Sequence, residues 1–216
     1  MPVPTICKRT MRCSDFIRQR PAANFHHAIR LASYLGTELN LFVSINFTLT
    51  NCEPDKTTIA FRKVRTAFGK WVTRPRACEQ EYKVAPTFVW VIENADGCLN
   101  AHWLVYVPEC RHTDFTTRLP AWIESAAGDI HHARAIHIQS AKTPTAAGKY
   151  MLKGMHPMLA RNFGIEHVYQ GWVTGKRIGT SKNLGATQRR RWIRLGKYPP
   201  PKQWVPFKYA QYAKAS

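Results

Sequence analysis

Acidic residues are scarce in this chain of 216 residues. Only 13 Asp and Glu stand against 32 Lys and Arg, so the formal net charge is +19 at pH 7. From His167 to the last residue there are eleven Lys and Arg and no acid. Solubility alone does not require such an excess, which is typical of proteins that bind a polyanion. We therefore expect nucleic acid as the partner.

Long apolar runs are also missing. No segment approaches the roughly 20 apolar residues that span a bilayer, and no basic helix shows the clean apolar face of a membrane-surface anchor. Residues 1–21 lack the continuous apolar core of a secretory signal. The sequence therefore predicts a cytoplasmic protein with no membrane partner.

Paired cysteine motifs are the third absence. The six cysteines are scattered without a CxxC pair, so neither a disulfide framework nor a zinc ribbon is predicted. Cys98, His102, Cys110 and His112 lie near one another in the sequence, but their spacing matches no common zinc finger.

The hydrophobic content of 44% is sufficient for one domain with a core. Apolar spacing predicts helices at 21–35, 57–72, 113–127 (interrupted near Pro120) and 143–154, and strands at 39–50, 86–93, 98–109 and 133–142. This order favours an α+β fold with a central antiparallel β-sheet flanked by helices. We expect an N-terminal basic arm and helix over 1–38, a main domain over 39–166 and a basic C-terminal extension over 167–216.

Polar side chains interrupt the apolar hairpin that the Asp-Gly turn at 96–97 predicts. Asn100 and His102 share one strand face, and Glu93 ends the neighbouring strand. An edge strand with two satisfied polar groups would explain Asn100 and His102. With Glu93 within reach, however, a carboxylate, an amide oxygen and an imidazole form a suitable ligand set for one divalent ion, with positions left open for substrate oxygens.

Tyr150 and Lys153 are three residues apart on a predicted helix and therefore neighbours on one face. A tyrosine hydroxyl is a weak nucleophile unless a cation favours its phenolate or a metal activates its target. Lys153 can supply that cation. The pair alone is a weak signal, since Tyr150 could simply cover the core, but it gains weight beside the candidate metal ligands.

These segments resemble a known family. "IENADGCLNAHWLVYVP", followed later by "GKYMLKG", is similar to the HUH endonuclease superfamily, specifically the single-tyrosine rolling-circle replication initiators. Their signature is a strand bearing His-hydrophobic-His, an upstream Glu as third ligand, and a helix bearing Tyr-x-x-Lys. "LFVSINFTLT" resembles the family's first motif, and the resemblance covers residues 39 to 155. Asn100 stands where the family has its first histidine.

The resemblance implies an HUH nuclease domain with an RRM-like core over 39–166. It implies metal-dependent nicking and joining of single-stranded DNA, or of a DNA hairpin, at the replication origin of a plasmid, phage or similar element. Tyr150 would form a 5′-phosphotyrosine link, assisted by Lys153. Glu93, Asn100 and His102 would bind the metal, and the oxygen donor at Asn100 favours Mg²⁺ or Mn²⁺ over zinc. The chain shows no helicase domain, so a host helicase and polymerase are expected partners.

Basic side chains outside the metal site would hold the DNA backbone. They are Arg62, Lys63, Lys149, Lys176, Arg177, Lys182, Arg189, Arg190 and Arg191. Trp172 and Trp192 are either base-stacking surfaces or ordinary packing residues.

Other functions stay open at this point. A single-tyrosine HUH transposase or a small relaxase would use the same chemistry. Asn100 also keeps open a DNA-binding module whose nuclease site has decayed.

Overall fold

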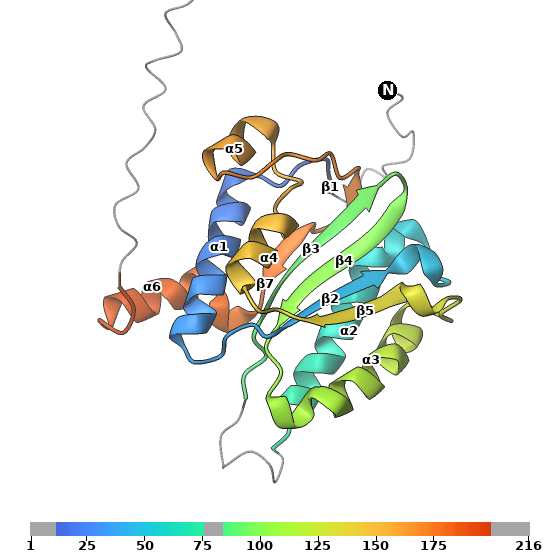
Figure 1. Ribbon diagram of the computed structural model, residues 1–216, viewed down its shortest axis with the longest axis horizontal. Coiled ribbons are helices and arrows are strands. Elements are labelled where there is room, and N and C mark those ends of the chain that lie inside the picture. Colours follow the sequence, from blue (N-terminus) through green and yellow to red (C-terminus); the bar gives the residue numbers. More distant parts are fainter. Residues whose placement is uncertain (1–11, 76–83, 200–216) are drawn as a thin grey trace, which may run out of the picture.

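A five-stranded antiparallel sheet organises the chain. The computed structural model describes residues 12–75 and 84–199, so residues 1–11 of the predicted arm and 200–216 of the predicted extension lie outside it. The strand order is β5-β2-β4-β3-β7. The strands are β2 (Leu41–Asn46), β3 (Phe88–Ala95), β4 (Cys98–Val105), β5 (Ile136–Ser140) and β7 (Ile178–Thr180). Helices cover both faces (Figure 1), which confirms the α+β class.

The hairpin of β3 and β4 forms the centre of the sheet. Asp96 and Gly97 connect the strands, and both have positive φ values, 51° and 80°. A two-residue loop with positive φ at both positions matches the twist of the flanking strands. The register pairs Glu93 with Asn100 and Val91 with His102. Because β4 is the middle strand of five, the interpretation of Asn100 and His102 as edge-strand residues is wrong.

One face of the sheet packs against α2 (Thr57–Val72) and α3 (His112–Ala127). Trp90 and Trp103 project from the strands into this layer, where Phe68 of α2 packs edge-on against Trp103. The bounds of α2 are those predicted. By contrast, α3 runs unbroken through Pro120. A proline removes only one backbone donor, and the apolar residues on both sides of Pro120 are anchored against α2.

The opposite face packs against α1 (Gln19–Tyr34), α4 (Pro144–Met151), α5 (Pro157–Asn162) and α6 (Ala186–Arg194). Thr143 and Pro144 occupy the predicted first positions of α4, although the Thr143 side chain makes no capping bond. Gly148 lets α4 approach α1 closely, because a Cβ there would lie 2.3 Å from Ile29 Cδ1. This contact places the last turn of α4 above the sheet.

Segments from both predicted flanking regions belong to this body. β7 is an edge strand of the sheet, and β6 (Val173–Thr174) pairs with β1 (Cys13–Ser14). The boundaries predicted at residues 38 and 166 therefore run through one packed unit. Cys13 is disulfide-bonded, which the scattered cysteines did not predict. Among the described helices, none has the length and apolarity to cross a membrane.

Candidate active site

Four of the five predicted metal-site and catalytic side chains meet in one hydrogen-bonded chain. Glu93 Oε2 lies 3.1 Å from His102 Nε2 and 3.1 Å from Lys153 Nζ. Lys153 Nζ also donates to the Tyr150 hydroxyl oxygen over 3.0 Å. The carboxylate thus joins the sheet hairpin to the turn that follows α4, across a separation of many residues in the sequence.

The chain runs from the interior to the surface. Glu93 is 3% exposed and His102 8%, whereas Tyr150 is 52% exposed. Burial alone lowers the pKa of Lys153, but its hydrogen bond to Tyr150 and the charge of Glu93 outweigh burial and raise the pKa above its ordinary value. A buried carboxylate therefore keeps a protonated lysine beside an exposed phenol.

His102 is held on two further sides by β2. Ser44 Oγ lies 2.9 Å from Nδ1, and the Phe42 ring stacks on the imidazole with centroids 5.6 Å apart and an interplanar angle of 14°. When Nδ1 carries the proton and donates to Ser44, Nε2 keeps its lone pair for another partner. A hollow of about 450 Å³ opens beside this ring and is lined by Phe42, Ser44, His102, Gln139, Ala146, Ala147 and Tyr150.

Asn100 is the fifth residue. It pairs directly across the sheet with Glu93 on one side and Asn46 on the other. Its amide nitrogen donates to the Cys98 carbonyl, which leaves Oδ1 without a hydrogen bond to a described residue. Asn100 therefore lies beside the site but outside the hydrogen-bonded chain.

The donor set fits a divalent ion. Glu93 Oε1 is buried and has no hydrogen-bond partner among the described residues, and buried carboxylate oxygens normally have one. No group of three His, Cys, Asp or Glu residues that could hold a metal exists in the described ranges. Beside Glu93 and His102, the Asn100 amide oxygen is a candidate third ligand, of a donor type that Mg²⁺ and Mn²⁺ accept.

Six of the nine predicted DNA-binding residues lie on helices, on the two sides of the sheet. Exposed Lys149, Arg190 and Arg191 lie on α4 and α6, on the same side of the sheet as Tyr150, with Arg189 half-buried beside them. Exposed Arg62 and Lys63 lie on α2, on the opposite side.

The C-terminal strand region holds the remaining basic residues. Lys176 and Lys182 are exposed and flank β7 in the sequence. Arg177 is only 4% exposed, and its guanidinium donates to the backbone carbonyls of Gln170 and Gly171. Arg177 therefore supports a backbone turn and does not face solvent. Trp172 is exposed, whereas Trp192 is partly buried and packs against the core cluster that includes residues of α1.

Sequence reasoning missed the contribution of β2 to the site. The alternation in "LFVSIN" places Phe42 and Ser44 on one strand face, so the sequence alone indicates that these two side chains point the same way. That this face lies against His102 depends on the register of β2 with β4, which no local pattern contains.

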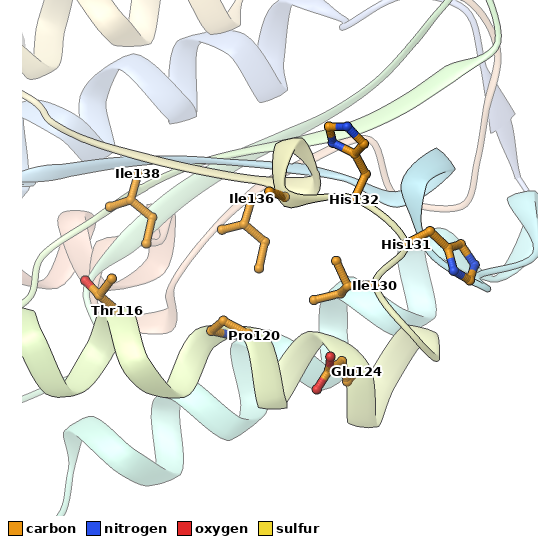
Figure 2. A pocket seen from close by; sticks show the side chains of 9 residues that line it. Thr116, Pro120, Glu124, Ile130, His131, His132, Ile136 and Ile138 are labelled. Carbon is orange, nitrogen blue, oxygen red and sulfur yellow. The ribbon is translucent and has the colours of Figure 1, made fainter.

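A larger hollow, of about 570 Å³, lies on the other face of the sheet, between α3 and the edge strand β5. Figure 2 shows Ile130, Ile136 and Ile138 facing Pro120 of α3 across it. Because Tyr150 and His102 lie on the opposite face, this hollow is separate from the candidate active site.

Comparison of the chain with protein-family models, with curated proteins and with solved structures finds no match. The assignment of a function rests on the residues and their geometry.

Proposed function

We propose that this protein is an HUH-type endonuclease that nicks and rejoins single-stranded DNA through a tyrosine nucleophile. The observation that carries the proposal is the continuous contact from His102 through Glu93 and Lys153 to the exposed hydroxyl of Tyr150. These residue types and their order are the ones on which the resemblance to rolling-circle replication initiators rests. Neither a structural core nor a simple DNA-binding surface needs this arrangement.

In the proposed reaction the Tyr150 oxygen attacks the scissile phosphorus. A bond forms between this oxygen and phosphorus, the bond from phosphorus to the 3′ oxygen breaks, and the departing oxygen takes up a proton to become a 3′-hydroxyl. The product is a 5′-phosphotyrosine ester, and attack by a 3′-hydroxyl reverses the step and rejoins DNA. The charged ammonium of Lys153 favours the phenolate form of the nucleophile.

Glu93, Asn100 and His102 would hold one Mg²⁺ or Mn²⁺. When bound, the ion polarises the scissile phosphate and offsets the charge that grows on its oxygens. Ser44 fixes the orientation of the His102 ring, and Glu93 keeps Lys153 against Tyr150.

The exposed cations of α4 and α6 border Tyr150 on the same side of the sheet, and they suit the backbone of an incoming strand. We propose a single-stranded or hairpin segment at the origin of a plasmid, phage or similar element as the substrate. A host helicase and a host polymerase would act after the nick.

A covalent-adduct assay tests the proposal. The full chain is incubated with single-stranded oligonucleotides from its own genetic neighbourhood and Mg²⁺ or Mn²⁺, and the products are separated on denaturing gels. We expect an adduct that Tyr150→Phe abolishes. The control is Tyr34→Phe, which changes another exposed tyrosine, on α1, and retains the adduct.

If no ion and no flanking sequence yields an adduct, the nuclease proposal fails and a DNA-binding module remains. A transposase or relaxase of the same chemistry would form the adduct as well, and would differ in the strand that it rejoins.

A further inference from the structure

Arg65 of α2 is a half-buried cation that has no ion pair with a described residue. Its guanidinium carbon lies over three aromatic rings, 4.2 Å from the centroid of Trp90, 4.9 Å from Phe61 and 5.9 Å from Phe88. No hydrogen bond or ion pair joins this guanidinium to another residue in the described ranges, and its Nε is buried without a partner. A guanidinium has five N–H donors, so this site holds unused donors in a fixed position.

A second cation shares the same indole. Lys176, in the turn between β6 and β7, places Nζ 5.8 Å from the Trp90 centroid. Burial lowers the pKa of Lys176, and repulsion from Arg65 lowers it further. Burial, followed by the charge of Arg62, lowers the pKa of Arg65 to about 10.

Two glycines bring the segment that carries Lys176 close to α2 and Trp90. Gly175 has φ +91°, and a Cβ there would lie 2.5 Å from Thr58 Oγ1 at the start of α2. At Gly179 of β7 a Cβ would lie 2.7 Å from the Trp90 ring. Both glycines allow the β6–β7 segment to pack closely on α2 and Trp90.

Neither cation has an acidic neighbour among the described residues. Contacts between a cation and an aromatic ring offset only part of the cost of removing that cation from water without a counter-charge. A phosphate group would accept charge-assisted hydrogen bonds from a guanidinium in fork geometry and from an ammonium. It would also remove the repulsion between the two cations.

We propose that Arg65 and Lys176 bind a phosphate group of a nucleic-acid backbone, on the face of the sheet opposite Tyr150. A polymer is favoured over a free phosphate because the cations continue along α2. A shallow hollow of about 250 Å³ on this helix is lined by Arg62, Lys63, Thr66, Ala67 and Lys70. A strand bound both here and at Tyr150 passes around the β7 edge of the sheet. The inference rests on the proposed DNA binding and is independent of cleavage.

The test is DNA binding without divalent metal, so that cleavage plays no part. The affinity of the full chain for an oligonucleotide is measured by fluorescence anisotropy at several salt concentrations, for wild type, Arg65→Met and Lys176→Met. Methionine keeps the apolar stem over the rings and removes the charge. Each variant should weaken binding and lower the slope of log K against log salt by about one. The control is Arg134→Met, which removes one exposed cation next to β5 and should retain the wild-type slope.

Thermal unfolding separates this role from a structural one. If Arg65 only supports the fold, Arg65→Met lowers Tm and leaves the salt slope unchanged, which overturns the proposal. If it binds phosphate, Tm is unchanged or higher and the slope falls. Inorganic phosphate, titrated at constant ionic strength, checks for a small ligand. If it raises the Tm of wild type but not of Arg65→Met while all DNA slopes stay equal, the site takes free phosphate and the nucleic-acid proposal fails. A failed adduct assay leaves all these readings intact.

Discussion

Replacement of Ser44 by alanine tests whether the sheet prepares His102 to bind a metal. Ser44 Oγ is the only partner of Nδ1 among the described residues, at 2.9 Å. In the proposed site Nδ1 donates this bond and Nε2 serves as the ligand atom. In the metal-free protein the contact with Glu93 Oε2 favours a proton on Nε2. Metal binding at Nε2 requires the proton on Nδ1, and without the Ser44 hydroxyl this proton has no acceptor among the described residues, so the metal-binding tautomer is less stable. Ser44 is thus a positioning residue.

The size of the expected effect follows from other metal-bound histidines whose second ring nitrogen has a hydrogen-bond partner. Loss of that partner lowers metal affinity or activity about 10- to 100-fold, which corresponds to ~1.4–2.7 kcal/mol. The cost to folding is smaller, because a single neutral hydrogen bond contributes about 1 kcal/mol. Ser44→Ala should therefore raise the concentration of Mn²⁺ at half-maximal adduct formation by one to two orders of magnitude and scarcely change Tm.

Two assays check this prediction. Metal titration of adduct formation gives the shift, and ¹⁵N NMR of the protein with bound Mg²⁺ gives the His102 tautomer directly. Ser44→Thr keeps a hydroxyl at the same position and should restore both values. Unchanged metal dependence together with an unchanged tautomer in Ser44→Ala would refute the reasoning.

Further substitutions probe the ligands and the fold. Asn100→His should retain or raise activity and broaden ion tolerance, measured as adduct yield across a series of metals. His102→Ala should abolish cleavage, and a fully active His102→Ala variant would contradict the assignment of the site. Arg111, 1% exposed, donates to three carbonyls at the end of α2, so Arg111→Met should lower the free energy of unfolding in urea by at least ~3 kcal/mol. Arg118→Met, which removes an exposed i,i+4 ion pair, should cost less than ~1 kcal/mol. Burial and then neighbouring cations lower the pKa of His27 to about 4 from 6.5. Between these pH values the unfolded chain binds more protons than the folded chain, so Tm should fall as pH drops from 6.5 to 4. His27→Gln should make Tm depend less on pH in this range.

Local sequence patterns predicted much of the fold. The bounds of α2 and the β3–β4 hairpin were predictable because helical periodicity and an Asp-Gly turn are encoded within a few residues. The spacing of Tyr150 and Lys153 likewise gave their contact. The central position of β4 was not predictable, since strand order depends on pairings between distant segments.

Two side chains have contacts that local sequence patterns cannot predict. Ser44 reaches His102 only through the register of β2 with β4. Arg65 has the sequence context of a solvated cation on a basic helix, and only the placement of β3 sets its guanidinium on Trp90. In both cases a polar residue acquires its role from a strand remote in the sequence.

In the proposed site, the carboxylate of Glu93 would serve the nucleophile and the metal at the same time, because its two oxygens have different surroundings. Oε2 contacts both His102 and Lys153, while Oε1 is buried and bonded to no described residue. A cation bound through Oε1 does not require Lys153 to leave Oε2, and Lys153 can keep its hydrogen bond to Tyr150. Glu93→Gln would replace one of these oxygens with an NH₂ donor that faces either Lys153 or the ion. The amide therefore cannot support both partners, which is a physical reason for a glutamate at this position of β3.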